Sequence, residues 1–162
     1  MGHAPWGQWN VYRQIHMLIM CTRQDAESYD FTKKIVNILG EYLPEAKARP
    51  ARAKDFDRLH GLFSSEQISL VILSRQIAKK YVLGVDYFKK YGKQKAKLVY
   101  DFNDMVLLST IDFPDNHAER ITDALIRASE QNKINRFINI SNDFPVAIHE
   151  GSKKVLDKYN GH

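Results

Sequence analysis

The chain has 162 residues, 44% of them hydrophobic, and this length suits one compact domain with a sizeable core rather than two domains. A formal net charge of +5 favours an anionic ligand, surface or partner, yet the basic residues are spread along the chain instead of forming one run. The single cysteine, Cys21, excludes an intrachain disulfide and a cysteine-based zinc site. The apolar run at residues 15–21 is too short to cross a membrane.

Residues 1–14 contain Trp6 and Trp9 among glycine and polar residues, without the periodicity of a helix or a strand. We expect an N-terminal arm here, followed by a single α/β domain at residues 15–162. The tryptophans suggest contact with a partner, and packing of the arm on its own core is the alternative. The opening Met1–His3 is consistent with removal of a leader, which would hide the compartment of the native protein.

The first half of the chain alternates between strand and helix patterns. Residues 15–21 form an apolar run of strand length, and the helical spacing of apolar residues over 35–43 predicts a helix that a proline ends. Ser28 or Asp30 is expected to cap this helix, and Asp55 is expected to cap the next one. A short strand within residues 46–53 is predicted near a sheet edge, because the proline it contains cannot donate to a strand ladder.

Residues 68–84, ISLVILSRQIAKKYVLG, are the stretch around which the rest of the chain is arranged. The near-continuous apolar run 68–73 predicts a central strand covered on both faces. Ser74, Arg75 and Gln76 then form a strand-to-helix turn at the carboxyl edge of the sheet, where open α/β folds bind ligands. A core strand followed by an ordinary surface helix is the alternative. The alternation of strands and helices predicts a three-layer α/β fold, with a mostly parallel sheet and helices on both faces.

The second half predicts two strands, at residues 98–100 and 105–110, joined by a polar turn. Asn116 is expected to cap the next helix, with Glu119 completing a capping box. Residues 85–97 interleave lysines with aromatic residues, as a groove for single-stranded nucleic acid would. A solvated connection whose aromatic rings point inward is the favoured interpretation, and we expect no nucleic-acid partner.

Catalytic patterns are scarce in this sequence, which contains no HExxH, GxSxG, GxGxxG or P-loop motif. His149 and Glu150 would form half of an acid/base pair, and a loop histidine bonded to the backbone is the favoured alternative. Asp101 and Asp104 share one turn and would suit a cation, although acidic turns commonly lack one. We therefore expect no enzyme, no catalytic residue, no metal ion and no cofactor.

Five segments follow one another in an order that is more informative than any of them alone. They are residues 28–31, 68–84, 96–110, 112–128 and 144–159. Together they resemble solute-binding proteins of the TAXI type, which serve tripartite TRAP transporters. Ser28 and Tyr29 match the family's thr-tyr-tyr helix entry, and Ser74 matches its glutamine-serine-aspartate turn. His149 and Gly151 match its late proline-leucine-histidine-proline-glycine-alanine segment.

The resemblance implies one lobe of a periplasmic-binding-protein-like fold, with a non-enzymatic role in transport. It also implies a periplasmic location, with a cytoplasmic one as the alternative. Members of that family close two lobes around a solute. In this chain residues 98–110 run almost directly into the segment that resembles the family's closing helix, so we expect a single-lobe form without the second lobe. Arg75 replaces the turn aspartate of the family, and Glu150 replaces the second proline of its late segment.

The candidate site depends on the strand order. If the first and third strands are neighbours, as in the flavodoxin-like order 2-1-3, the loop at residues 23–29 and the turn at Ser74 meet at one edge. Two helix N-termini and the arginines there would form an electropositive notch for a carboxylate or phosphate. The predicted ligand-binding residues are Arg23, Ser28, Tyr29, Ser74, Arg75 and His149, and the predicted partner contacts are Trp6 and Trp9.

We therefore expect a protein that binds a small anionic solute in a half-open site at the carboxyl edge of its sheet. Because pockets normally enclose most of a ligand, a protein partner or a second copy of the chain would cover this site. The alternative is a periplasmic accessory protein that docks on a secreted enzyme or a transporter and has lost solute binding.

Overall fold

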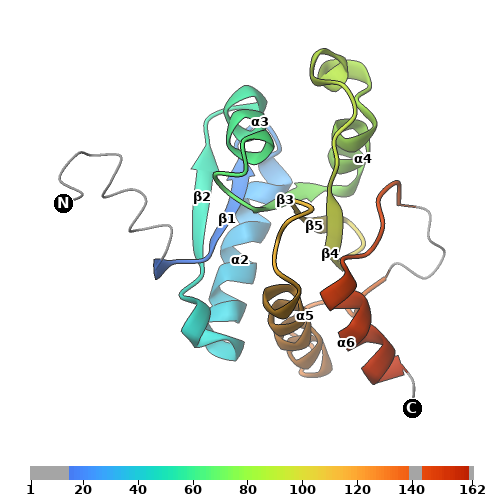
Figure 1. Ribbon diagram of the computed structural model, residues 1–162. Coiled ribbons are helices and arrows are strands. Elements are labelled where there is room, and N and C mark those ends of the chain that lie inside the picture. The colour runs from blue at the N-terminus through green and yellow to red at the C-terminus, as the bar shows by residue number, and fades with distance from the viewer. Residues whose placement is uncertain (1–14, 139–143, 161–162) are drawn as a thin grey trace, which may run out of the picture.

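Five strands form one sheet in the computed structural model of the chain, which describes residues 15–138 and 144–160 (Figure 1). They are β1 (Leu18–Thr22), β2 (Arg49–Ala53), β3 (Leu70–Ser74), β4 (Lys97–Asp101) and β5 (Met105–Ser109). Their order across the sheet is β2-β1-β3-β5-β4. Both β2 and β3 lie parallel to β1, whereas β5 is antiparallel to β3 and β4. Four of the five strands thus run in one direction, and β5 runs in the opposite direction.

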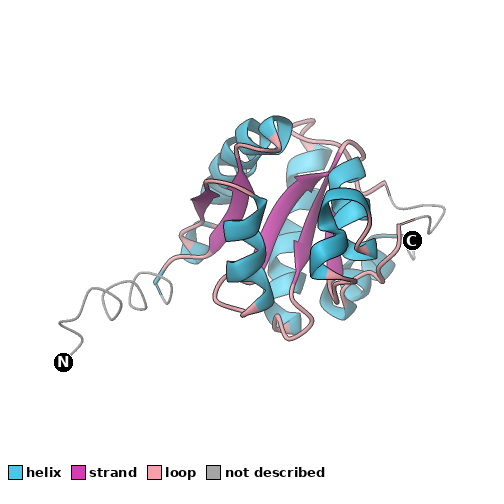
Figure 2. Ribbon diagram, turned by 90° about the horizontal axis from the view of Figure 1, so that it is seen from above, coloured by secondary structure: helices cyan, strands magenta, loops and turns pink. Residues whose placement is uncertain are grey.

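Helices cover both faces of this sheet, as the view from above shows (Figure 2). They are α2 (Ala26–Tyr42), α3 (Phe56–Ser64), α4 (Arg75–Leu83), α5 (Asp115–Glu130) and α6 (Glu150–Asn160), with short 3-10 helices η1 (Pro44–Ala46) and η2 (Asp86–Tyr91). Alternation along the strands builds two cores. Ile19 packs into the core that includes α2, α5 and α6, whereas Leu18 and Met20 pack into the core that includes α3, α4 and η2. The predicted three-layer α/β fold is confirmed.

The predicted central strand is also confirmed. β3 lies between β1 and β5, and its residues 70–73 are all buried. The edge position predicted for residues 46–53 is confirmed by β2, which forms one end of the sheet. Among residues 15–138 and 144–160, no helix combines the length and the hydrophobicity that crossing a bilayer requires.

Two of the three predicted helix caps were wrong, whereas the third is confirmed, because the Asp55 side chain caps α3. α2 begins one residue after Asp25, so neither Ser28 nor Asp30 caps it, and the Ser28 hydroxyl donates to the Asp25 carbonyl oxygen at 2.9 Å. α5 begins one residue after Pro114, and Asn116 is its second residue. Proline suits this position because its fixed φ, here −60°, matches the helix and its missing N–H is not needed there.

The chain also covers the outer edge of β4. The Leu98 amide donates to the Ala147 carbonyl oxygen at 2.9 Å, and the His149 amide donates to the Leu98 carbonyl oxygen at 2.8 Å. These bonds satisfy backbone groups that an exposed edge strand would leave open for association. They also place the start of α6 beside the start of β4.

Candidate functional site

The loop after β1 and the start of α4 meet at the carboxyl edge, as the predicted order 2-1-3 requires. One Asp25 carboxylate oxygen accepts from the Ser74 amide at 2.7 Å. The Gln24 side-chain oxygen accepts from the Phe56 amide, also at 2.7 Å, at the start of α3. Free amides at helix N-termini can bind external anions, but here the chain uses its own side chains for two of these groups.

Arg75 is engaged within the protein. Its guanidinium donates to one carboxylate oxygen of Asp101 at 2.7 Å, and Asp101 is fully buried. The same oxygen accepts from the Asn103 amide at 2.9 Å. The Phe144 ring lies 5.5 Å from the guanidinium carbon, and the Arg75 amide donates to the Asp104 carbonyl oxygen. This arginine, at the start of α4, therefore neutralises a buried carboxylate at the end of β4.

A hollow of about 560 Å³ lies at this turn, lined by residues 24–27, 74–77 and 103–104. Its lining contains the carboxyl groups of Asp25, Glu27 and Asp104, against the guanidinium of Arg75. The electropositive notch expected at Ser74 and Arg75 is therefore not what these residues form. The expectation counted the arginine and the helix ends, but not the acidic side chains that folding brings beside them.

A group of cations gathers instead around Tyr29, on the same edge above β1 and β2. The charged groups of Arg23, Lys33 and Arg52 lie 5.9, 5.2 and 5.1 Å from the centre of the Tyr29 ring. We call these four residues the Tyr29 cluster. The three cations are exposed, and none of them forms an ion pair with a carboxylate within the described residues. The ring attracts them through its electron-rich face, but it leaves their charge unneutralised.

Secondary structure explains how the Tyr29 cluster forms. Arg23 follows the last residue of β1, and Lys33 lies four residues after Tyr29 on the same side of α2. Arg52 lies in β2, opposite Cys21 of β1 in the strand register. Burial raises the pKa of the Cys21 thiol, whereas the positive charges of Arg52 and Lys33 act in the opposite direction. Positive charge thus gathers over the carboxyl end of β1.

The remaining predicted ligand residues differ in accessibility. Ser28 is fully buried, and its hydroxyl bonds to the backbone at the start of α2, so it lies beneath the surface that carries the cluster. Ser74 ends β3, and its amide is taken by Asp25. Arg23 and Tyr29 were predicted, but Lys33 and Arg52 were missed. Lys33 could have been identified from its spacing of four residues after Tyr29. Arg52 could be identified only once the pairing of β1 with β2 is known.

His149 lies at the opposite edge of the sheet and does not join these residues. It is fully buried at the start of α6. One ring nitrogen, Nε2, lies 2.7 Å from the Phe113 carbonyl oxygen, and the other, Nδ1, accepts from the Gly151 amide at 3.1 Å. These partners require the tautomer protonated on Nε2. His149 therefore connects α6 to the segment before α5.

Asp115, His149 and Glu150 lie close enough together to suggest a metal site. However, the Nδ1 atom of His149 that faces the two carboxylates already accepts from the backbone. Glu150 is paired with Lys97 at 2.8 Å, and this bond holds the pKa of Glu150 below its usual range. We assign no metal to this group.

The lysine-rich segment agrees with the favoured interpretation only in part, because Tyr87 is exposed instead of pointing inward. Phe88 is buried, and the Lys90 ammonium lies 4.5 and 5.2 Å from the ring centres of Tyr87 and Tyr91. Lys90 also pairs with Asp57 at 3.0 Å, and the Tyr91 hydroxyl donates to the same carboxylate. The chain's own cation thus occupies the ring faces on which nucleic-acid bases would stack.

The predicted partner contacts, Trp6 and Trp9, lie outside the described residues. The fold and the Tyr29 cluster define the class of the protein: a single α/β domain with unpaired cations at the carboxyl edge of its sheet. A comparison with protein-family models finds no match, and no curated protein matches the chain.

Proposed function

We propose that the chain is a non-enzymatic binding protein that recognises an anionic ligand at the Tyr29 cluster. The observation that carries this proposal is the position of three cations around one ring, with no carboxylate paired to any of them in the described part of the chain. Like charges held on one surface repel one another, and a bound anion relieves this repulsion. Two of the cations are arginines, whose planar groups fit carboxylate or phosphate oxygens in pairs.

The same proposal covers relationship and location. A single lobe related to the TAXI solute-binding proteins of TRAP transporters would have an α/β fold with its ligand edge at the carboxyl ends of β1 and β3. The sheet order β2-β1-β3 and the helices on both faces support this relationship. A periplasmic location belongs to the proposal as well, and cell fractionation of the native protein tests it.

A protein partner is the second candidate ligand, and the exposure of the cluster favours it. The hollow at the same edge is lined by residues 24–27, 74–77 and 103–104, and Tyr29, Lys33 and Arg52 lie outside that lining. A small solute on such an open surface would remain largely in water, whereas an acidic patch of a partner would cover the cluster. In that case the chain is an accessory protein that docks through this edge.

Calorimetric titration with pyrophosphate and with a short aspartate-rich peptide tests the proposal and separates the two ligands. We expect saturable binding of at least one probe, weakened about tenfold or more by Arg52→Gln, because a charge-assisted hydrogen bond contributes about 1.5–3 kcal/mol. Arg58→Gln is the matched control, since Arg58 is exposed on α3 and is not one of the cations around the Tyr29 ring. Absence of binding by both probes, or equal losses in the two variants, would overturn the proposal.

A further inference from the structure

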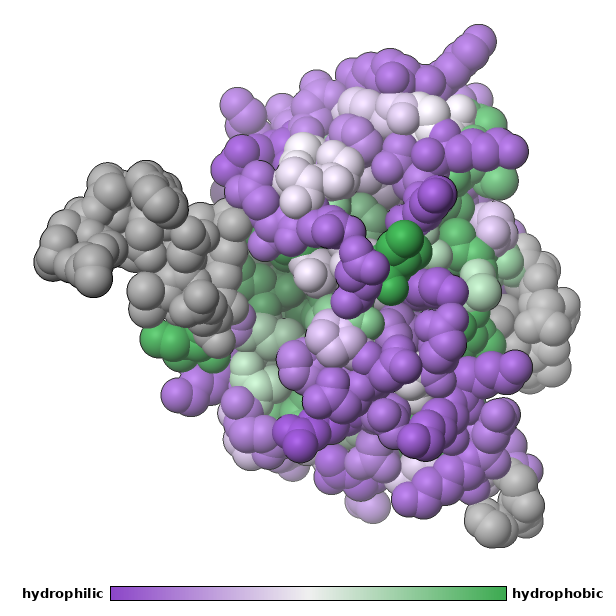
Figure 3. All heavy atoms as spheres, viewed as in Figure 1, coloured by the Kyte–Doolittle hydropathy of each residue, from purple (hydrophilic) through white to green (hydrophobic). Residues whose placement is uncertain are grey.

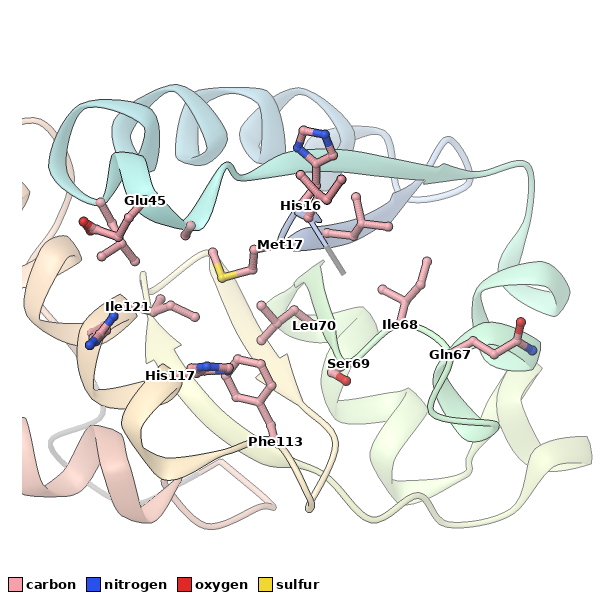
Figure 4. A pocket seen from close by; sticks show the side chains of 15 residues that line it. His16, Met17, Glu45, Gln67, Ile68, Ser69, Leu70, Phe113, His117 and Ile121 are labelled. Carbon is pink, nitrogen blue, oxygen red and sulfur yellow. The ribbon is translucent and has the colours of Figure 1, made fainter. Parts of the chain in front are cut away.

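A further unexplained feature lies at the other end of the sheet. A cavity of about 350 Å³ opens where β1 and β3 begin, bounded by η1 and by the first turns of α5 (Figure 4). The strands β1 and β3 are paired at two positions, Ile19 with Leu70 and Met20 with Val71. The backbone before these pairs is not joined across the two strands, and the cavity lies between the separated segments.

Apolar side chains form much of the floor and walls of the cavity, beside the polar side chains of His16, Gln67 and Ser69. Met17 and Ile68 come from the separated segments, and Phe113 and Ile121 come from the other side (Figure 4). Leu43, which precedes η1, also lines the cavity. Figure 3 shows hydrophobic surface in this part of the molecule, beside the start of β1, within a mostly hydrophilic face. Apolar walls of this extent suit a hydrocarbon group, and the volume lies within the range of small-molecule sites, about 300–1,000 Å³.

Opposite charges stand at the rim of this cavity. Glu45 belongs to η1 and Arg120 belongs to α5, and both side chains line the opening. Both are exposed, and neither takes part in an ion pair or a side-chain hydrogen bond within residues 15–138 and 144–160. His117, also at the rim, has its ring 5.8 Å from that of Phe113. The rim thus offers one acceptor charge and one donor charge on different elements.

We propose that this cavity binds an apolar α-amino acid, such as leucine or phenylalanine. The side chain fills the apolar space, the carboxylate pairs with Arg120, and the ammonium group pairs with Glu45. A ligand with both charges matches the two rim groups, whereas a simple carboxylic acid would leave Glu45 facing an anion. This site lies at the opposite edge from the Tyr29 cluster, and it does not depend on the function proposed there.

Three probes test each part of this recognition: L-leucine, 4-methylpentanoate, which lacks the amine, and 3-methylbutan-1-amine, which lacks the carboxylate. NMR titration of the full chain should show saturable leucine binding, with amide shifts in residues 15–18, 68–70 and 113–121. We expect leucine to bind at least about tenfold more tightly than either single-charge analogue, a difference of about 1.4 kcal/mol. Amides of the Tyr29 cluster should not shift.

Charge-neutral variants assign the two contacts. Arg120→Gln should weaken leucine and 4-methylpentanoate but not the amine, and Glu45→Gln should weaken leucine and the amine but not the acid. Arg58→Gln and Glu41→Gln, both at exposed positions outside the cavity lining, are the matched controls. The proposal is overturned if leucine shows no shift up to its solubility limit. It is also overturned if either rim variant binds leucine as the controls do, or if 4-methylpentanoate binds as tightly as leucine.

Discussion

The two edges of the sheet use their polar groups in different ways. At the carboxyl edge, Asp25 holds the Ser74 amide, and Arg75 neutralises the buried Asp101, so the turn expected to hold a ligand is joined to its neighbours. At the amino edge, β1 and β3 separate and leave a cavity with Glu45 unpaired at its rim. The Tyr29 cluster, on the outer part of the carboxyl edge, gathers three cations that form no ion pair within the described residues.

The comparison teaches that position in an α/β fold does not by itself make a binding site. The carboxyl edge of such a sheet is where ligands bind in related architectures. Here the polar groups of the central turn on that edge already form hydrogen bonds within the protein. A ligand cannot use the same groups. A ligand is therefore expected to bind where charged groups or apolar walls have no partner within the described part of the protein.

The largest effect is expected from Arg75→Ala, which tests whether the turn is structural. Removal of the guanidinium leaves the carboxylate of Asp101 buried without its counterion, and loss of one partner of a buried pair costs about 3–5 kcal/mol. Urea unfolding followed by circular dichroism measures the change. Lys154→Ala is the control, because the pair of Lys154 with Glu119 is exposed and contributes about 0–1 kcal/mol. If the two variants lose similar stability, the turn is not held by this pair.

A smaller loss is expected at the amino edge from Gly151→Ala. A Cβ atom at Gly151 would collide with the backbone carbonyl of Asp115 and lie 3.1 Å from the Ala118 side chain. Overpacking of this kind costs about 1–3 kcal/mol. Gly61→Ala is the matched control in α3, with no atom within 4 Å of the new Cβ, and it should stabilise the protein by about 0.5–1 kcal/mol. Thermal unfolding should move in opposite directions for the two variants, and a shared direction would contradict the packing described for α6.

The smallest effect lies away from both edges, at His60 of α3. Its ring is stacked on Tyr91 at 4.0 Å, and its Nδ1 atom lies 2.8 Å from the Tyr81 hydroxyl. Burial lowers the pKa of His60 below its ordinary 6.5, and the negative charge of Asp57 acts in the opposite direction. The unfolded chain therefore takes up the proton first as the pH falls. The contribution of neutral His60 to the free energy of unfolding is complete above pH 6.5 and is lost below it.

Unfolding free energies measured at several pH values check this sign. The wild-type protein should lose stability as the pH falls below 6.5, and His60→Gln should lose less over the same interval. Equal slopes for the two proteins would show that His60 does not titrate in the way its burial requires.

Much of the fold follows from local patterns in the sequence. Residues 68–73 are almost continuously apolar because both faces of β3 are covered, and this pattern marks the central strand. Alternation of strands and helices correctly predicts three layers. The residue before α2 could not be predicted in the same way, because Asp25 uses its carboxylate on Ser74, which is 49 residues further along the chain.

The candidate site was less predictable because its balance of charge depends on tertiary pairing. The neutralisation of Arg75 by Asp101 requires β3 and β4 to lie on either side of β5, and no spacing in the sequence reveals this. His149 was grouped with the carboxyl edge through a family resemblance. The reversed strand β5 returns the chain to the amino edge, and the bonds between Leu98 and residues 147–149 keep His149 there.

An NMR titration of the isotope-labelled protein with pyrophosphate tests most directly where this chain receives an anion. If the Tyr29 cluster is the site, the amides of Arg23, Tyr29, Lys33 and Arg52 shift in a saturable way, while those of Ser74 and Arg75 stay in place. Shifts centred on Ser74 and Arg75, or no saturable shift at any amide, would contradict the account.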